Sequence, residues 1–127
     1  MSGARFARDA VTARLREWLR LKVRAEIFPL AAQVAEKHGL RIEGLMVKSQ
    51  RTRWASCSAK KNLSLNIKLL FLSPELVRYV LVHELCHTVH MNHSKEFWRL
   101  VACAEPQYRI LDQGLREAWK SVPQWLF

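Results

Sequence analysis

Residues 73–87 read Ser73-Pro-Glu-Leu-Val-Arg-Tyr-Val-Leu-Val-His-Glu-Leu-Cys-His87, the pattern of a well-capped helix. Ser is a favoured N-cap, Pro fits the first helical position, and Glu complements the positive end of the helix dipole. The apolar residues predicted to form the buried face recur at helical spacing: Leu76, Val77, Val80 and Leu81. We expect the helix to run from Pro74 to about His90.

This helix carries a pattern typical of a metal site, His83-Glu84-Leu-Cys-His87. Histidines four apart lie within roughly 40° of each other on a helix surface, so both imidazoles can reach one tetrahedral ion at about 2.0–2.1 Å. Glu84 flanks the ion and is placed to hold a metal-bound water, not to act as a ligand. The spacing therefore predicts a zinc site.

A catalytic zinc needs a third protein ligand and an open position. Three residues downstream of His87 are candidates: His90, His93 and Glu96. In an unbroken helix His90 would lie beside the first two ligands, where it could not complete a tetrahedron. His93 is favoured because Asn92 tolerates the left-handed conformation that ends a helix, which would turn the chain back over the metal.

Downstream of this turn, two more helices are predicted. Ser94 is an N-cap with Glu96 in the first turn, and that helix should reach about Ala104, before Pro106. A last helix is expected from Tyr108 to Lys120.

Upstream, the pattern changes from helix to strand. A helix is expected from Ala10 to Phe28, an interruption or kink at Pro29, and a second helical stretch that Gly39 ends. Three short segments then favour a small antiparallel sheet, with a turn at residues 59–62: Gly44–Ser49, Arg53–Cys57 and Leu63–Ile67. We therefore expect one domain over residues 1–127, with a basic helical part (1–40), a sheet (44–68) and the remaining helices (74–120).

Composition limits the classes of function. The chain has 127 residues and a net charge of +10, and residues 1–60 hold 13 Lys/Arg against 5 Asp/Glu. Such a basic half can meet nucleic acid or another polyanion. No apolar run approaches the roughly 18–20 residues that span a bilayer, and the N-terminus does not resemble a secretory signal, so we expect a cytoplasmic protein without membrane contact. Three scattered cysteines predict reduced thiols, not a disulfide framework.

The motifs together resemble the YgjP-like metallopeptidases, relatives of the SprT-like zincins. The resemblance runs from about Val47 to Tyr108 and rests on three blocks: Arg51-Thr-Arg-Trp-Ala-Ser-Cys-Ser58, Asn62-Leu-Ser-Leu-Asn66, and His83-Glu-Leu-Cys-His87-x5-His93 with Ser94-Lys-Glu-Phe-Trp98. It implies a zincin-like α+β fold in which the sheet packs on the active-site helix. It also implies one zinc ion on His83, His87 and His93, with Glu84 as the catalytic carboxylate. Ala55 stands where the family usually carries Gly.

The expected activity is hydrolysis of a peptide or protein through a zinc-bound water that Glu84 activates. Tyr108 and Arg109 are candidates for stabilising the transition state, because both follow the site in sequence. Residues 53–56 are expected to offer a strand edge to an extended peptide: Arg53, Trp54, Ala55 and Ser56. Trp54 either lines that groove or packs in the core, and Trp98 is expected to be a core anchor.

The sequence leaves three other functions open. Cys57 could close the site as a fourth ligand and make the zinc structural. Nucleic-acid binding could be the main role, or could combine with proteolysis as in SprT-like proteins that act on DNA-crosslinked proteins. The basic residues that would carry it are Arg16, Arg20, Arg24, Lys48, Arg51, Arg53, Lys60 and Lys61. A catalytically idle relative is the third alternative, although every residue that the reaction needs is present.

Overall fold

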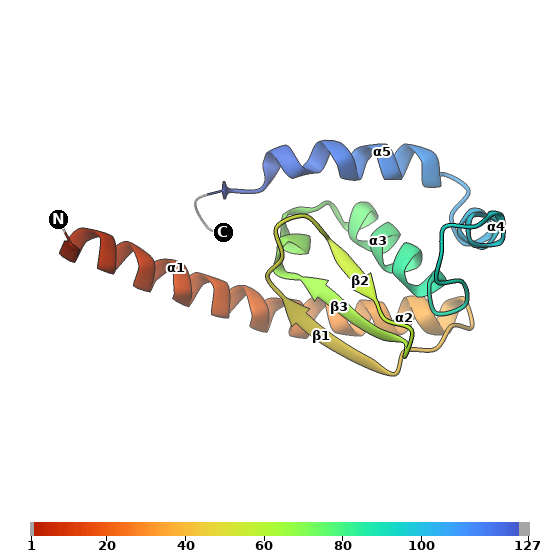
Figure 1. The fold of residues 1–127 in the computed structure, drawn as a ribbon, viewed down its shortest axis with the longest axis horizontal. Helices are drawn as coiled ribbons and strands as arrows, with labels where there is room; N and C mark the ends of the chain where they lie inside the picture. The colour runs from red at the N-terminus through yellow and green to blue at the C-terminus, as the bar shows by residue number, and fades with distance from the viewer. Residues whose placement is uncertain (1, 125–127) are drawn as a thin grey trace.

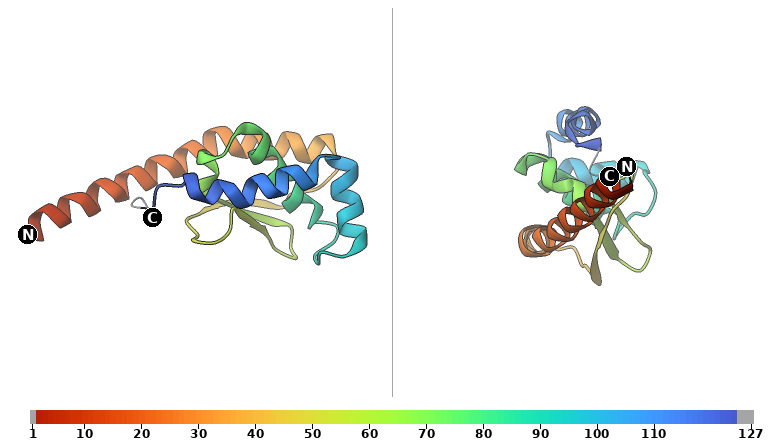
Figure 2. Two further views of the ribbon diagram at one scale, coloured as in Figure 1. Left: turned by 90° about the horizontal axis from the view of Figure 1, so that it is seen from above. Right: turned by 90° about the vertical axis from the view of Figure 1, so that its left-hand side faces the viewer.

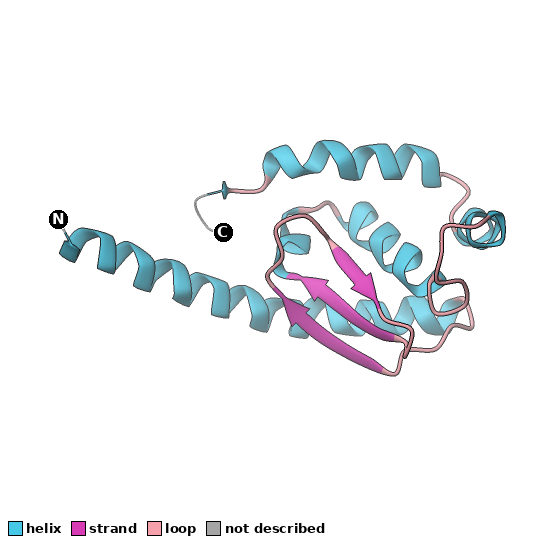
Figure 3. Ribbon diagram, viewed as in Figure 1, coloured by secondary structure: helices cyan, strands magenta, loops and turns pink. Residues whose placement is uncertain are grey.

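Helices cover one face of a three-stranded sheet in the computed structural model, which describes residues 2–124 (Figures 1 and 3). The fold is therefore α+β, as predicted. In chain order the elements are α1 (Ser2–Lys22), a π-helical turn (Val23–Ile27), α2 (Phe28–Lys37), β1 (Gly44–Lys48), β2 (Ala55–Cys57), β3 (Asn62–Asn66), a 3₁₀ helix (Ile67–Phe71), α3 (Pro74–Cys86), α4 (Lys95–Ala104), α5 (Tyr108–Ala118) and a 3₁₀ turn (Trp119–Ser121).

The N-terminal helix passes Pro29 without breaking. A proline cannot donate a backbone hydrogen bond, and its ring clashes with the carbonyl four residues earlier. Here the residues before it form a wider π-helical turn, in which the N–H of Phe28 bonds to the carbonyl of Val23, five residues back. The interruption expected at Pro29 is thus a local change of helical register that lets α1 and α2 continue as one rod.

Two turns lie where the sequence predicts them. Gly39 ends α2 with a positive φ of 64°, and the N–H of Leu40 bonds to the carbonyl of Ala35 at 2.8 Å. This is the left-handed helix termination that glycine favours. In the turn before β3, Lys61 adopts a φ of 66° and donates its N–H to the carbonyl of Ser58.

The sheet is mixed, not antiparallel as expected. Its order is β1-β3-β2, so β3 is central and β2 is an edge strand. β2 pairs antiparallel with β3, as predicted, with Ser56 opposite Ser64. The prediction was wrong for β1, which pairs parallel with β3, with Val47 opposite Leu65. The physical reason is the connection between β1 and β3. β2 lies between these strands in sequence but takes the far edge of the sheet, antiparallel to β3. The chain therefore runs through β3 in the same direction as through β1.

Helix α3 is the centre of the molecule. It contacts β2, α2, α4 and α5, and Figure 1 shows it between the sheet and α5. Ser73 caps it by accepting a hydrogen bond from the N–H of Leu76, and Pro74 takes the first helical position. The side chains of Leu81 and Leu85 are fully buried. Burial of each such side chain is worth about 1.5–3 kcal/mol, so α3 is held firmly against its neighbours.

The N-terminal half of α1 projects beyond the rest of the fold (Figure 2). Leu19 and Val23 are buried where the rod crosses the body, whereas Val11 and Trp18 are more than half exposed. No helix within residues 2–124 is both long and apolar enough to cross a membrane.

Candidate active site

The site begins where α3 ends. The helix stops at Cys86, four residues before the expected end at His90. The next N–H groups bond three residues back, from His87 to Glu84 and from Thr88 to Leu85, and this tightening closes the helix. Asn92 does not take the left-handed conformation that we expected, since Lys61 is the one non-glycine residue with positive φ among residues 2–124. The chain reverses in the turns after Cys86 instead.

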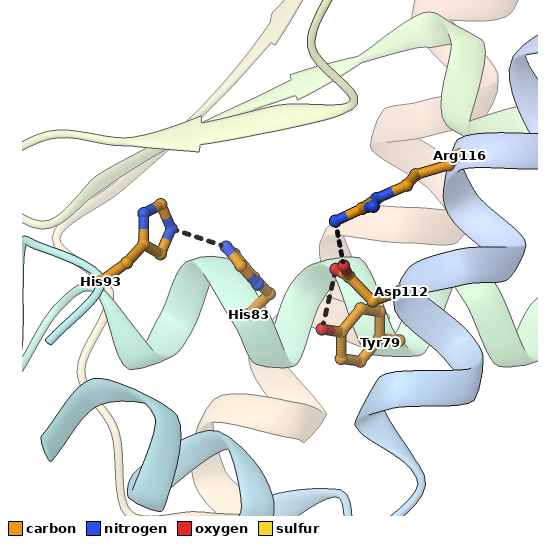
Figure 4. Close-up of polar contacts among 5 residues, drawn as sticks. All are labelled: Tyr79, His83, His93, Asp112 and Arg116. Atoms are coloured by element: carbon orange, nitrogen blue, oxygen red, sulfur yellow. Dashed lines mark hydrogen bonds and ion pairs between the residues drawn. The ribbon is translucent and has the colours of Figure 1, made fainter. Parts of the chain in front are cut away.

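This reversal brings three imidazoles together. One ring nitrogen from each of His83, His87 and His93 lies within 4.8 Å of the others. The Nε2 atoms of His83 and His93 are 3.3 Å apart (Figure 4). For bonds of about 2.0–2.1 Å, the edge of a tetrahedron is about 3.3–3.4 Å, so this pair matches the spacing of two ligands on one tetrahedral ion.

The tautomer of the His87 imidazole is set by the backbone carbonyl of His90. Nδ1 of His87 lies 2.9 Å from the carbonyl oxygen of His90. A carbonyl only accepts, so Nδ1 carries the proton and Nε2 keeps its lone pair. This arrangement is common in metal-bound histidines. The residues present therefore fit a metal ion.

Aromatic side chains from α4 hold the imidazoles in place. Phe97 is fully buried and stacks on His87, with ring centroids 4.3 Å apart. Trp98 stacks on His93 at 5.7 Å. It was expected to be a core anchor, and it is partly buried and packs against the core. Ser94 starts α4 by accepting a hydrogen bond from the N–H of Phe97, which links the position of His93 to the helix cap.

Burial shifts the protonation of the site toward neutral side chains in the metal-free protein. Desolvation, with the charges of His87 and His93, lowers the pKa of His83 to about 4. Desolvation raises the pKa of Glu84 to about 8, partly opposed by the nearby Arg53. A neutral imidazole is the form that binds metal, and a carboxyl that titrates near neutral pH can accept and return a proton.

The site opens into a pocket of about 410 Å³ beside the edge strand β2. Its lining joins the metal-site histidines to the strand: Arg53, Ala55, Ser56, Cys57, His83, Glu84, His87, Met91 and His93. Three of the four residues predicted for a substrate groove therefore lie here. The fourth, Trp54, is 8% exposed and lines an adjoining pocket.

Tyr108 and Arg109 lie elsewhere. The hydroxyl of Tyr108 accepts a hydrogen bond from Nε of Arg109 at 3.2 Å, and its ring stacks on Trp98. Both residues line a pocket of about 730 Å³ along α4 and α5, and neither Glu84 nor His83 lines that pocket. The geometry separates these two side chains from the histidine pocket.

A polar network that sequence reasoning missed lies beside His83. Asp112 of α5 accepts a hydrogen bond from the hydroxyl of Tyr79 at 3.2 Å and pairs with Arg116 at 3.4 Å (Figure 4). Burial and the charge of Asp112 both raise the pKa of Tyr79. In the sequence, this network is indicated only by the four-residue spacing of Tyr79 and His83, which puts both side chains on one face of α3. The partner on α5 depends on tertiary packing.

The other ligand candidates are not brought to the cluster. The metal-binding group found among residues 2–124 contains neither His90, Glu96 nor Cys57. Glu96 is fully exposed in the first turn of α4. Burial, followed by the charge of Glu84, raises the pKa of the Cys57 thiol to about 11 in the metal-free protein.

Comparison with known proteins identifies related folds. The structure is similar to the metallopeptidase zymogen abylysin of Pyrococcus abyssi, with a TM-score of 0.65, 23% identity, and coverage of 72% of this chain and 92% of that one. It is also similar to the metallopeptidase zymogen jannalysin of Methanocaldococcus jannaschii, with a TM-score of 0.62, 21% identity, and coverage of 72% and 95%. No curated protein matches the sequence.

These similarities establish the fold, and the sequence itself gives the family. The family model described as YgjP-like, metallopeptidase domain matches residues 2–118. That span includes α3, β2 and the segment that carries His93, which together build the histidine pocket. The chain therefore belongs to the YgjP-like family of metallopeptidase domains.

Proposed function

We propose that this protein hydrolyses peptide bonds with one zinc ion held by His83, His87 and His93, and with Glu84 as the group that moves the proton. The observation that carries the proposal is the meeting of three imidazoles beside the partly buried carboxyl of Glu84, in a pocket bordered by a sheet edge. Three ligands leave a fourth position open, as catalytic zinc sites do.

The choice of zinc rests on the ligand set. Three imidazoles form a borderline donor set that suits zinc better than magnesium or calcium, which prefer oxygen. When bound, zinc acts as a Lewis acid and lowers the pKa of a coordinated water toward about 7.

Two side chains would then act on the reacting peptide. Glu84 accepts the proton of the attacking water and returns it to the leaving amine. Arg53 lines the pocket on both sides of Glu84, so we assign to it the stabilisation of negative charge on the carbonyl oxygen. Tyr108 and Arg109, the earlier candidates, would contact more distant parts of a substrate from their own pocket.

The substrate is proposed to bind as an extended chain along β2. This strand pairs with β3 on one side, so its other edge can accept backbone hydrogen bonds with little dependence on sequence. Ala55 and Ser56 of this strand line the histidine pocket, which would bring a paired peptide next to Glu84.

The experiment is removal and return of the metal. An unfolded protein substrate is incubated with purified enzyme, with chelator-treated enzyme, and with the latter after addition of zinc. We expect cleavage, loss of cleavage, and recovery at about one zinc per chain. Equal cleavage before and after complete metal removal would exclude a zinc mechanism.

A polyanion contact is a second candidate. The observation that favours it is the projection of α1, on which Arg8 and Arg14 are exposed (Figure 2). DNA bound through such residues should dissociate steeply as salt is raised. Absence of retention on immobilised DNA at low salt would remove this candidate.

A further inference from the structure

A second pocket adjoins the histidine pocket at Glu84. It has a volume of about 240 Å³ and extends from the active site toward α5. The two pockets share one wall: Arg53, Ala55, His83 and Glu84. A peptide whose scissile bond lies at Glu84 therefore has a neighbouring residue next to this second pocket.

The rest of its lining is mainly apolar, and we call it the tryptophan pocket. Its own walls are Trp54, Val80, Leu115 and Trp119. The rings of Trp54 and Trp119 stack with centroids 3.9 Å apart and an interplanar angle of 18°. The indole N–H of Trp54 is buried with no acceptor among the described residues, so ring packing and not hydrogen bonding shapes this wall.

The charges around the tryptophan pocket select against a basic side chain. Its one acidic residue apart from Glu84 is Asp112, and both carboxylate oxygens of Asp112 are engaged, one by Tyr79 and the other by Arg116. The remaining charged residues of the lining, Arg53 and Arg116, are cations. A lysine or arginine side chain would meet like charge there without a free carboxylate.

The size matches one large side chain. At about 30 Å³ for each water in the liquid, 240 Å³ corresponds to about eight water molecules. The side chain of phenylalanine has seven heavy atoms and is of similar bulk. Transfer of such an apolar side chain from water to an apolar wall is favourable because it removes apolar surface from water.

We propose that the tryptophan pocket binds a large uncharged apolar side chain, aromatic or leucine-like, of the substrate residue next to the scissile bond. The pocket thus sets the cleavage specificity of the enzyme, with Leu115 and Trp119 as its adjustable walls. This inference rests on the proposed function, because it assigns a role to the neighbour of the same catalytic site.

The test compares two matched peptides in wild type and in two variants of α5. The peptides differ only in Phe or Ala at the residue next to the cleaved bond, and mass spectrometry locates the cut. Leu115→Phe fills the pocket. Leu111→Phe is the matched control, because Leu111 is one turn earlier on α5 and partly buried like Leu115, but lines neither the tryptophan pocket nor the histidine pocket.

In wild type, kcat/KM for the Phe peptide should exceed that for the Ala peptide by on the order of 10-fold or more. Leu115→Phe should bring this ratio close to one, whereas Leu111→Phe should keep it. If Leu115→Phe fails to fold, Leu115→Ala enlarges the pocket and should shift the preference toward Trp. An unchanged Phe-to-Ala ratio in folded Leu115→Phe, no shift toward a Trp peptide in Leu115→Ala, or equal cleavage of the Phe and Ala peptides by wild type would overturn the proposal.

Binding to Glu84→Gln separates this proposal from the proposed function. Calorimetry on this variant measures the affinity for both peptides without hydrolysis. If wild type cleaves no peptide but the variant binds the Phe peptide at least several-fold more tightly, the proposed function fails and the side-chain pocket stands. Cleavage by wild type with equal affinities for the two peptides would contradict the pocket alone.

Discussion

His93 is the proposed ligand whose position depends most on tertiary structure. His83 and His87 are brought together by one helix, but His93 reaches them through the turns that follow Cys86 and the cap of α4. His93→Ala leaves two imidazoles, and we expect zinc affinity to fall by more than roughly 100-fold, because even residues that only contact ligands typically contribute 10–100-fold.

His90→Ala is the matched control for this substitution. His90 contacts His87 through its backbone carbonyl, which alanine retains, so the zinc content of this variant should equal that of wild type. Metal analysis after dialysis against a weak chelator measures the zinc content of both variants. A His93→Ala protein with full zinc content would mean that another residue is the third ligand.

Glu84 gives the metal-free protein a specific dependence on pH. Its pKa is raised by burial from 4.5 to about 8. Between these values the unfolded chain gives up the proton while the folded chain holds it, so the free energy of unfolding falls as pH rises through this window. Glu84→Gln cannot ionise, and its advantage in Tm over wild type should therefore grow from pH 4.5 to 8 and then level off.

Thermal unfolding of metal-free wild type and metal-free Glu84→Gln at several pH values tests this pH dependence directly, because the other titrating groups are common to the two proteins. A constant difference in Tm over the whole range would show that the Glu84 carboxyl is not held in its neutral form.

At the scale of elements, the two serine caps make a matched pair. Ser94 starts α4 next to His93, whereas Ser73 starts α3 at the end remote from its histidines. Ser94→Ala and Ser73→Ala should each cost about 0.5–2 kcal/mol in the free energy of unfolding. Only Ser94→Ala should also weaken zinc binding, because it loosens the segment that carries His93.

Denaturant unfolding and zinc titration of the two variants give the comparison. If both variants lost the same zinc affinity, the effect would come from general destabilisation, and the link between the α4 cap and the third ligand would be wrong.

Elements with local causes could be predicted from the sequence. Ser73-Pro74 and Ser94 cap the helices that they predict, and Gly39 ends α2 with positive φ. The pair His83 and His87 follows from helical geometry alone.

What escaped prediction depends on contacts between distant segments. The parallel pairing of β1 with β3 depends on which strand takes the centre of the sheet. The early end of α3 depends on the turn that delivers His93 over His87. Asp112 meets Tyr79 because α5 packs on α3, and their 33-residue separation gives no periodic signal.

At the scale of the whole molecule, the projecting half of α1 should be separable from the metallopeptidase body. Removal of residues 2–10 takes away a segment that extends beyond the fold (Figure 2), and the described side chains of residues 7–10 are exposed. We expect the free energy of unfolding to change by less than about 0.5 kcal/mol, with zinc content unchanged. Calorimetry and metal analysis of the shortened chain provide the check, and a fall in zinc content would show that α1 supports the site.

The same variant tests the polyanion candidate. Wild type that binds DNA should elute at lower salt after the basic residues of this segment are removed, since each phosphate contact contributes to the salt dependence. Elution at an unchanged salt concentration would assign any DNA contact to residues outside this segment.

In the proposed function, a zinc ion on three histidines and the carboxylate of Glu84 together cleave peptides. The most direct measurement is the rate of peptide hydrolysis by Glu84→Gln at a zinc content equal to that of wild type. Glutamine keeps the shape of the side chain and removes its ability to move a proton, so we predict full zinc occupancy and a loss of kcat of at least about 10²-fold. Hydrolysis at the wild-type rate by the zinc-loaded variant would show that Glu84 does not move the proton.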